Sequence, residues 1–329
     1  MSRSESAEGP ALSSIIVTPD DFDTIATTVR HLSAQSIAAQ LELVIVAPSA
    51  DRVRVPPHEK GSFHSVRIVE IGELKSLAAA KAIGASVATA PVVAFNEDHS
   101  FPEPGWAEAL LGAHRGGYTG VAPQMKNANP ATALSCAAMF LHFGGTVEPS
   151  SGFETDYPAA THNMSYTRAA LSECGDRLGD LLVAEMFLHE ALRARGHRLW
   201  VEPSAVTRHA NISQLWPALV HAWIGGRLYG GLRRAFGAWP LGRRIVYAGG
   251  SPLIPLLRLR RVVPLMRRTA AGRIALPRAL PAITLILIVH ALGEAAGYLV
   301  GVGATRDSYS EFETHRNRHV KREERALWA

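Results

Sequence analysis

The sequence predicts an α/β fold over residues 13–212 and a basic, apolar helical region over residues 213–304. Three observations support this division. In the first part, short apolar runs alternate with helical patterns, which is typical of a mostly parallel sheet covered by helices on both faces. Between Glu202 and Glu294 there is no acidic residue, whereas thirteen arginines lie in that interval. One apolar stretch of the second part is long enough to cross a bilayer.

Length and cysteine content set the broad class. A chain of 329 residues can bury one good-sized core, or one domain with an appendage. Its two cysteines, Cys136 and Cys174, form no disulfide framework and have no metal-ligand spacing, so we expect both to be reduced. Residues 1–12 are polar without a hydrophobic signal region, so we expect a disordered segment and no export.

Four strands are predicted before residue 96, each followed by a helix or a turn. A helix that Asp21 or Asp23 caps follows the first strand, and an alanine-rich helix over residues 74–88 is expected to pack close to the sheet. Right-handed crossovers then bring all the strand ends to one rim of the sheet. The predicted strands are residues 14–17, 41–46, 66–71 and 92–95.

The stretch PVVAFNEDHSFPEPGW, residues 91–106, is the candidate functional centre. Its apolar strand ends abruptly in Glu97, Asp98 and His99, three potential metal ligands side by side, and prolines prevent the strand from continuing. In a buried parallel sheet, ligands gather at the carboxyl ends of the strands. Acidic residues buried there need a cation or hydrogen-bond donors. The alternative interpretation is a solvated polar loop.

This stretch resembles the family 2 glycosyltransferases of the GT-A fold, in which an "Asp-Asp-Asp…Pro-x-x-Trp-Leu" segment ends a central strand. In that family the acidic cluster holds a divalent metal that bridges the diphosphate of a nucleotide sugar. Glu97, Asp98 and His99 fall on the three acidic positions, so the resemblance implies a site for Mn²⁺ or Mg²⁺. His99 is a departure, because the family has an acid there.

The resemblance continues to about His209. Residues 200–209 resemble the family's "Pro-x-Ala-x-Val-x-His" strand, whose histidine approaches the metal in several members. His209 together with His99 gives a mixed nitrogen and oxygen shell, which suits Mn²⁺ or another transition metal better than an all-oxygen site does. The predicted metal ligands are therefore Glu97, Asp98, His99 and His209.

A predicted helix over residues 181–199 is similar to the family's "Glu-Asp-x-x-Leu…Arg-Leu-x-x-x-Gly" segment, whose aspartate is the general base. Ala184 takes the first acidic position and Glu185 the second, so the resemblance implies Glu185 as the catalytic base. Inverting sugar transfer needs a carboxylate within hydrogen-bond reach of the acceptor hydroxyl. The alternative is an ordinary surface glutamate, a role that Glu190 fits better.

Donor- or acceptor-binding roles are implied for three further residues. Lys81 lies on the arginine position of the family's "Ala-Arg-Asn-x-Gly" helix, and His162 and Asn163 lie in a segment similar to "Gly-His-Asn-x-x-Tyr/Phe-Arg". A solvated lysine and a buried structural histidine are the alternatives. Residues 47–50, APSA, replace the family's Asp-Asp-Gly-Ser, so recognition of the nucleotide base is altered or left to backbone groups.

The helical region has the composition of a membrane-associated segment. Tryptophans and arginines are interleaved with apolar residues after Leu215, which favours anionic lipid headgroups over nucleic acid as partner. Residues 280–302 can cross a bilayer, although His290 and Glu294 are costly at its centre. Arginines flank both ends, and this symmetry favours a hairpin or an in-plane anchor over one crossing. Residues 305–329 are predicted to form a charged tail.

The resemblance thus implies a family 2-like glycosyltransferase (EC 2.4 class), and the helical region places it at the cytoplasmic face of the inner membrane. It would move a sugar from a nucleotide-sugar donor to an acceptor such as a lipid-linked or envelope glycan, with inversion and a divalent metal. The alternative is a catalytically impaired scaffold on the same fold, favoured by the missing acids at residues 47–50 and by Ala184. A nucleotidyltransferase would need a glycine-rich phosphate loop near the first strand, and the sequence has none there.

Overall fold

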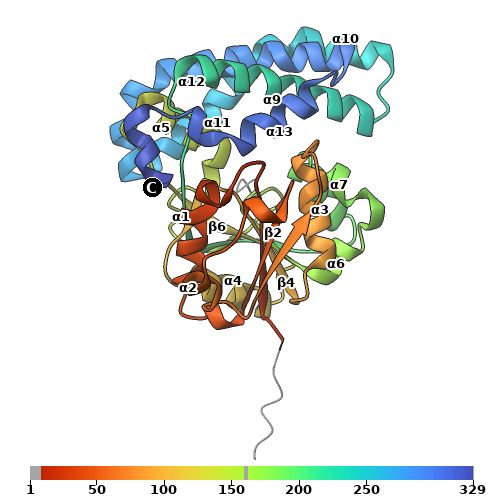
Figure 1. Cartoon of the computed structure of the whole chain (residues 1–329). Helices are drawn as coiled ribbons and strands as arrows, with labels where there is room; N and C mark the ends of the chain where they lie inside the picture. The colour runs from red at the N-terminus through yellow and green to blue at the C-terminus, as the bar shows by residue number, and fades with distance from the viewer. Residues whose placement is uncertain (1–8, 159–161, 329) are drawn as a thin grey trace, which may run out of the picture. The chain divides into compact units, whose positions relative to one another are not determined.

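The computed structural model describes residues 9–158 and 162–328, which form two compact units (Figure 1). The sheet unit comprises residues 9–124, 149–208 and 328, and the helical unit comprises residues 125–148 and 209–327. The helical unit thus starts close to the predicted boundary at residue 213, and it also takes in residues 125–148, which the sequence pattern placed with the sheet. Most of the predicted disordered N-terminus lies outside the described residues.

The central sheet has the strand order β3-β2-β1-β4-β8-β6-β9-β5 among the described residues, with β7 paired to β9. Strands β1 to β4 pair in parallel, and β8 runs antiparallel between β4 and β6. The strands are β1 (Leu12–Val17), β2 (Leu41–Ala47), β3 (Ser65–Glu70), β4 (Val92–Asn96), β5 (Ser100–Pro102), β6 (Gly120–Asn127), β7 (Phe153–Glu154), β8 (Ser165–Thr167) and β9 (Leu199–His209).

Helices cover both faces of this sheet, as the alternating pattern predicts (Figure 1). On one face, α1 buries Ile25 and Val29 in a core that it shares with Ile16 of β1 and Trp106 of α4. On the other face lies α3. The helices of the sheet unit are α1 (Phe22–Ser33), α2 (Pro57–Lys60), α3 (Leu77–Val87), α4 (Trp106–Arg115), α6 (Arg168–Ser172), α7 (Leu178–Leu181) and α8 (Glu185–Arg193).

Parallel strands covered on both faces should be apolar throughout, and every residue of β1 and β2 is buried. The alanine-rich helix α3 packs directly on them, because a Cβ atom on Gly84 would lie only 2.7 Å from Cγ2 of Ile15. The predicted fold class is therefore confirmed for the α/β sheet and for the helical C-terminal region. The first strand begins at Leu12, one residue before the predicted start of the folded domain.

The predicted continuous helix over residues 181–199 is wrong in its bounds. Helix α7 ends at Leu181, the extended backbone of Ala184 (φ −147°, ψ 107°) interrupts the pattern, and α8 begins at Glu185. Leu182 and Val183 are buried in this interruption, so their apolar character reflects core packing rather than a helix face. The predicted stop is confirmed, because Gly196 has a φ of +85° after α8 has ended.

The helical unit packs around α12, which contacts α5, α9, α10 and α11. The predicted charged tail is folded, because α13 packs against α9. Its helices are α5 (Ala133–Phe143), α9 (Leu215–Phe236), α10 (Leu241–Gly250), α11 (Ile254–Arg268), α12 (Ala270–Val300) and α13 (Thr305–Thr314), with 3₁₀ turns Gly144–Thr146, Ser251–Leu253 and Arg316–Arg318. A last 3₁₀ turn, Arg322–Trp328, ends at the residue that belongs to the sheet unit.

Helices α9 and α12 lie side by side in parallel, with their backbones in contact (Figure 1). Each helix carries two glycines four residues apart at the contact, and any side chain there would collide with the partner backbone. Small residues at this spacing are typical of helix pairs in membranes. On α9, a Cβ atom at Gly226 would lie 2.1 Å from the carbonyl oxygen of His290, and one at Gly230 would lie 2.5 Å from that of Glu294. On α12, a Cβ atom at Gly293 would lie 2.5 Å from the carbonyl oxygen of Trp223, and one at Gly297 would lie 2.3 Å from that of Arg227.

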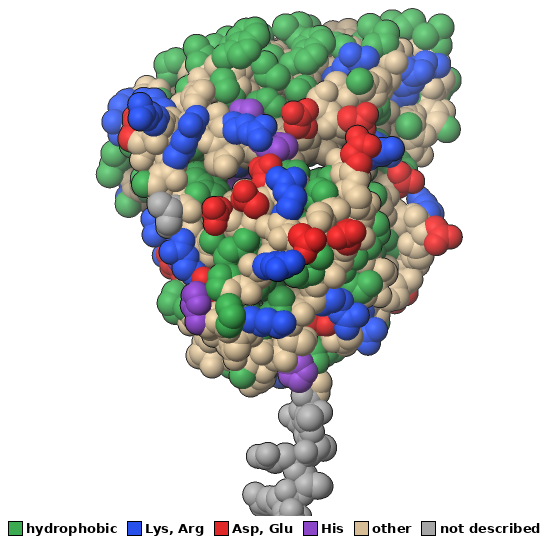
Figure 2. All heavy atoms as spheres, viewed as in Figure 1, with side chains coloured by type: hydrophobic (Ala, Val, Ile, Leu, Met, Phe, Trp, Pro, Cys, Tyr) green, Lys and Arg blue, Asp and Glu red, His purple; other side chains and the backbone are tan. Residues whose placement is uncertain are grey.

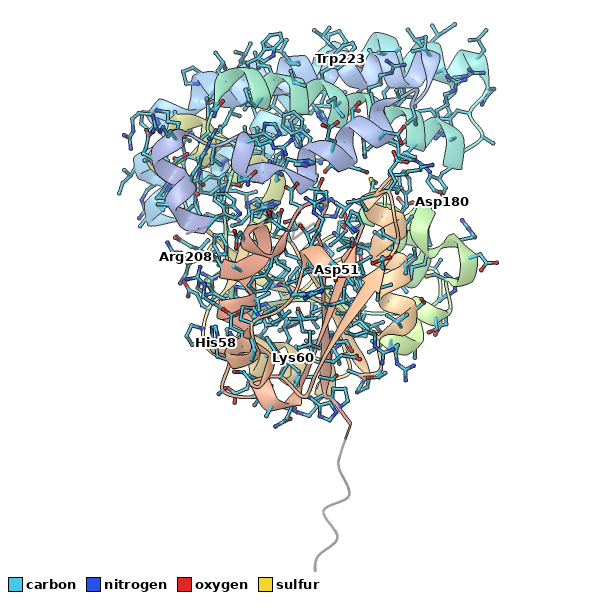
Figure 3. The ribbon with its side chains drawn as sticks, in the orientation of Figure 1. Asp51, His58, Lys60, Asp180, Arg208 and Trp223 are labelled. Atoms are coloured by element: carbon cyan, nitrogen blue, oxygen red, sulfur yellow. The ribbon has the colours of Figure 1, made fainter. Side chains whose placement is uncertain are left out.

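The two units differ in their surfaces. The sheet unit exposes charged side chains such as Asp51, Lys60 and Asp180, whereas Trp223 projects from α9 of the helical unit (Figure 3). In the view of Figure 2, hydrophobic side chains gather along one edge of the helical unit. An exposed apolar surface of this extent marks a site of association with another molecule or with lipid.

Candidate metal centre and active site

The acidic turn predicted from the sequence follows β4 directly and is buried. Glu97, Asp98 and His99 are 7%, 3% and 0% exposed, so the alternative of a solvated loop is wrong. Helix α1 holds the turn, because Oγ1 of Thr28 lies 3.3 Å from the carbonyl oxygen of Glu97 and 3.1 Å from that of Ser100. Three buried polar side chains are thus fixed at the carboxyl end of a central strand.

The imidazole of His99 is oriented by its neighbour. Nδ1 of His99 lies 2.5 Å from Oδ1 of Asp98, and a carboxylate can only accept a hydrogen bond. The proton of the neutral ring is therefore on Nδ1, and the lone pair is on Nε2. Nε2 lies 3.6 Å from Oε2 of Glu97.

His209, the last residue of β9, is oriented in the same way by Asn211. Nδ1 of His209 lies 3.0 Å from Oδ1 of Asn211. The amide cannot be reversed, because Nδ2 of Asn211 donates to the carbonyl oxygen of His209 at 3.2 Å and to Oδ1 of Asn127 at 3.1 Å. Nδ1 of His209 therefore carries the proton, and Nε2 has the lone pair that a metal needs.

A buried polar network fixes Asn211 in turn. The backbone amide of Asn211 donates to Oδ1 of Asn129 at 2.8 Å, and Nδ2 of Asn129 donates to the carbonyl oxygen of Asn211, also at 2.8 Å. Oγ of Ser135 donates to Oδ1 of Asn129 at 3.0 Å. The aromatic ring of Phe143 packs on His209, with ring centroids 4.6 Å apart. His209 thus has little freedom to rotate.

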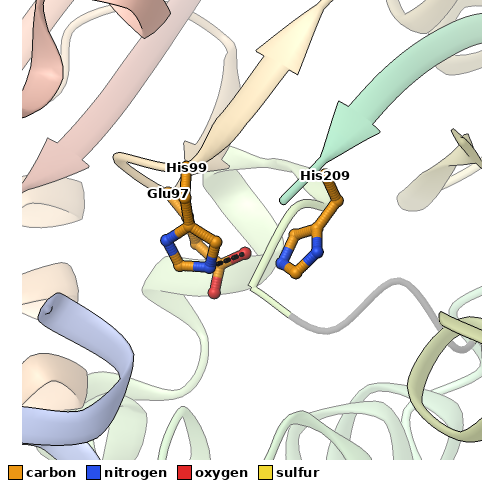
Figure 4. Close-up of side chains that lie close together, drawn as sticks. All are labelled: Glu97, His99 and His209. Atoms are coloured by element: carbon orange, nitrogen blue, oxygen red, sulfur yellow. Dashed lines mark ion pairs between the residues drawn. The ribbon is translucent and has the colours of Figure 1, made fainter. Parts of the chain in front are cut away.

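Glu97, His99 and His209 form a group that could hold a metal ion (Figure 4). Each offers one ligand atom, these atoms lie within 4.8 Å of one another, and all three residues are buried. Two imidazoles and one carboxylate suit Mn²⁺, Fe²⁺ or Zn²⁺. Histidine ligands normally donate their second N–H to a carboxylate or carbonyl oxygen, which Asp98 and Asn211 provide here. The residues therefore fit a divalent metal, with Asp98 orienting His99 rather than joining the group.

Glu185 lies at the start of α8 and is buried, so it is not the ordinary surface glutamate of the alternative interpretation. Its Oε1 accepts the backbone N–H of His162 at 3.0 Å, and its carboxylate forms an ion pair with Nδ1 of His162. His162 adopts a left-handed backbone (φ +65°), which is uncommon for a residue with a side chain. Glu190 is exposed, as predicted.

Asn163 and Lys81 complete the surroundings of the two acids. Nδ2 of Asn163, the residue that follows His162, donates to Oε2 of Glu97 at 2.6 Å. Lys81 is only 2% exposed, with Nζ 5.7 Å from the ring centroid of Phe95, so the alternative of a solvated lysine is wrong. Residues 160–161, the start of the segment that contains His162, lie outside the described residues.

The ion pair shifts the pKa values of both Glu185 and His162. Burial raises the pKa of Glu185, but the charge and hydrogen bond of His162 and the charge of Lys81 outweigh it and lower this pKa to about 2. Burial lowers the pKa of His162, but the charges of Glu185 and Glu97 outweigh it, so this pKa is raised. The ionised pair is thus favoured near neutral pH.

These shifts predict how stability depends on pH. The contribution of His162 is complete below its ordinary pKa of 6.5 and is lost as pH rises through the raised pKa of the folded state. The contribution of Glu185 is complete above 4.5 and is lost as pH falls toward 2. The native chain should therefore exceed H162Q in free energy of unfolding by the largest amount between pH 4.5 and pH 6.5, as measured by urea unfolding in EDTA. An advantage that stays constant from pH 5 to pH 9 would contradict the ion pair.

Asn211 was not predicted as a site residue, although it lies two positions after His209. We expect N211A to weaken Mn²⁺ binding by about 10–100-fold, because the substitution removes the acceptor that orients His209. The measurement is a Mn²⁺ titration followed by electron paramagnetic resonance. In a chain that already carries H209A, adding N211A should have no further effect; an equal effect in both backgrounds would show that Asn211 acts on the fold instead.

No protein-family model matches the chain, and no curated protein matches it significantly in sequence. Solved structures similar to it include GalNAc-T7 with UDP, GalNAc and Mn²⁺, at 15% identity over 61% of this chain and 43% of that chain, with a TM-score of 0.44. S. aureus TarS has 12% identity over 89% and 55% of the two chains, with a TM-score of 0.44. A mycobacterial protein has 14% identity over 62% and 68%, with a TM-score of 0.41. The chain spans about half the length of the first two.

Proposed function

We propose that the chain is a glycosyltransferase that moves a sugar from a nucleotide-sugar donor to an acceptor at a membrane surface, with inversion. The observation that carries this proposal is the buried group of Glu97, His99 and His209 at the ends of two strands of the sheet. A second buried acid, Glu185, is joined to it through His162 and Asn163. Sugar transfer from a nucleotide-diphosphate sugar needs both groups. The metal stabilises the negative charge that develops on the leaving diphosphate, and the carboxylate accepts the proton of the acceptor hydroxyl.

A divalent metal held by Glu97, His99 and His209 would act as a Lewis acid toward the departing diphosphate. Mn²⁺ is the first candidate, because two imidazole ligands favour a transition metal over Mg²⁺. Asp98 and Asn211 keep the two imidazoles in the tautomer that the metal requires. Lys81 adds a buried positive charge close to the donor diphosphate in this proposal.

Glu185 is the proposed general base toward the acceptor hydroxyl. A carboxylate with a pKa of about 2 is a weak proton acceptor, and His162 supplies much of that depression. When His162 loses its proton, the lowering influence disappears and the proton affinity of Glu185 rises, because the two groups titrate as a coupled pair. His162 thus sets when Glu185 can accept a proton from the acceptor.

The acceptor is proposed to lie at the membrane surface on the cytoplasmic side, and a lipid-linked or envelope glycan has the required chemistry. Support comes from the helical unit, whose exposed surface combines apolar side chains with arginines and carries no acid between Glu202 and Glu294. Anionic lipids attract such a surface.

The test is donor hydrolysis by the full chain over a panel of nucleotide sugars, with Mn²⁺, with Mg²⁺ and with EDTA. We expect metal-dependent release of the nucleoside diphosphate from a subset of donors. A scaffold that has lost activity, the alternative suggested by residues 47–50 and Ala184, would release none. Hydrolysis that is equally fast in EDTA would contradict the metal-dependent mechanism.

A further inference from the structure

Helix α12 is the one helix among the described residues that is long and apolar enough to cross a membrane. It has 31 residues, and 33% of its most apolar stretch is buried inside the protein. The chain before and after α12 decides whether a crossing is compatible with the fold. A helix that crosses once leaves its two flanking segments on opposite sides of the bilayer.

The chain leaves the sheet unit after Arg208 and returns to it at Trp328. Nε1 of Trp328 donates to the carbonyl oxygen of Asp98 at 3.2 Å, and its ring packs edge-on against Phe101 at 6.2 Å between centroids. The segment that follows α12 therefore contacts, through Trp328, the same folded unit from which the segment before α12 departs.

Within the helical unit, the segments before and after α12 also contact each other. Helix α13, which follows α12, packs against α9, which precedes it, and Nε2 of His221 lies 2.7 Å from Oε1 of Glu313. Further on, Oγ of Ser213 donates to the carboxylate of Glu324 and accepts the backbone N–H of Lys321 at 2.8 Å. No other described helix has the length and hydropathy of a span, so the described residues offer no second candidate that would return the chain across a bilayer.

The polar residues that would be costly in a bilayer are satisfied inside the helical unit. Nε2 of His290 lies 3.2 Å from Oε1 of Glu294, and the hydroxyl of Tyr298 donates to Oε2 of Glu294 at 2.8 Å. A guanidinium N–H of Arg233 on α9 donates to that hydroxyl at 2.9 Å. Glu294 and Tyr298 are buried, so the α9 side of α12 carries the polar side chains.

The opposite side of α12 is an apolar stripe, which we define as Ile274, Leu285, Ile288, Leu292 and Leu299. These residues follow helical spacing, and each is at least 40% exposed. Helices α10 and α11, which pack against α12, also expose apolar side chains, namely Leu241, Ile245, Val246, Leu256 and Leu257. The same three helices carry exposed arginines, namely Arg243, Arg260, Arg261, Arg267, Arg268, Arg273 and Arg278.

We infer that α12 lies in the plane of the membrane surface without crossing it, with its apolar stripe in the boundary between headgroups and acyl chains. The exposed arginines bind anionic headgroups, since no acidic residue of this interval competes for them. This inference rests on the membrane association in the proposed function. The flanking arginines favour either a hairpin or an in-plane anchor. A hairpin needs a second apolar segment that crosses the bilayer, so we infer the in-plane anchor.

The test measures the depth of α12 in vesicles of phosphatidylcholine and phosphatidylglycerol at a ratio of 3:1. Full-length chain carrying C136S and C174S receives one new cysteine at Ile274, Leu285, Leu292 or Leu299, each labelled with an environment-sensitive fluorophore and quenched by lipids with spin labels at known depths. All four sites are exposed, so the fold should be retained. The matched control is a label at Lys60, an exposed residue of the sheet unit.

An in-plane helix places all four labels at one shallow depth, about 5–10 Å below the headgroups. Ile274 and Leu299 are about 38 Å apart along the helix, so a crossing places them at opposite surfaces with Leu285 deep between them. That graded result would overturn the in-plane orientation but leave membrane association intact. Labels that do not respond to vesicles, with protein remaining in the supernatant, would overturn membrane association itself and the inference with it. Donor hydrolysis is a separate readout, so either failure can be told from failure of the proposed activity.

Discussion

E185Q is expected to lower turnover by about two to four orders of magnitude while donor affinity stays nearly unchanged. Glutamine keeps the shape of the side chain and can still accept the backbone N–H of His162, but it cannot accept a proton. The substitution also removes the ion pair with His162. The measurement is steady-state kinetics with the donor found in the panel, together with donor titration.

Two variants sharpen this experiment. E190Q changes an exposed glutamate of the same helix and should leave turnover unchanged. E185D restores a carboxylate one methylene shorter and should keep part of the activity. If E185Q turns over nearly as fast as the native chain, Glu185 is not the base, and His162 becomes the next candidate.

H99A and H209A are each expected to weaken Mn²⁺ binding by more than about 100-fold, a larger loss than removal of an orienting neighbour causes. Each substitution deletes one of three buried ligand atoms, and metal-dependent donor binding should be lost in parallel. H99D should shift preference toward Mg²⁺, because it makes the site richer in oxygen. The measurement is metal titration followed by donor titration at saturating metal.

H58A is the control for this pair, because His58 is an exposed histidine of the sheet unit (Figure 3). It should bind Mn²⁺ as tightly as the native chain. Unchanged Mn²⁺ affinity in both H99A and H209A would exclude the proposed metal centre.

The sheet, and the acidic turn at the end of β4, could be predicted from the sequence, because buried parallel strands need uninterrupted apolar residues. The acids that follow β4 stand out against such a run. The break before α8 could not be predicted in the same way, since Leu182 and Val183 are apolar in a loop for the same reason that they would be apolar in a helix. Pattern alone does not distinguish the two.

The residues that orient the two imidazoles were harder to predict than the candidate ligands. Asp98 falls on a ligand position of the family motif, but its carboxylate bonds the ring of His99. Asn211 has no motif, and its role depends on Asn129, which is distant in sequence. The burial of Lys81 also follows from packing against Phe95 rather than from its helix pattern. Such roles are set by tertiary contacts, which a single sequence does not display.

The proposed function requires above all that this chain bind a nucleotide sugar through a metal held by Glu97, His99 and His209. The most direct measurement is calorimetric titration of nucleotide sugars into the full chain, first with Mn²⁺ and then after its removal with EDTA. We predict that at least one nucleotide sugar binds with Mn²⁺ and that binding disappears when the metal is removed. Absence of binding by every nucleotide sugar, or equal affinity with and without the metal, would contradict this prediction.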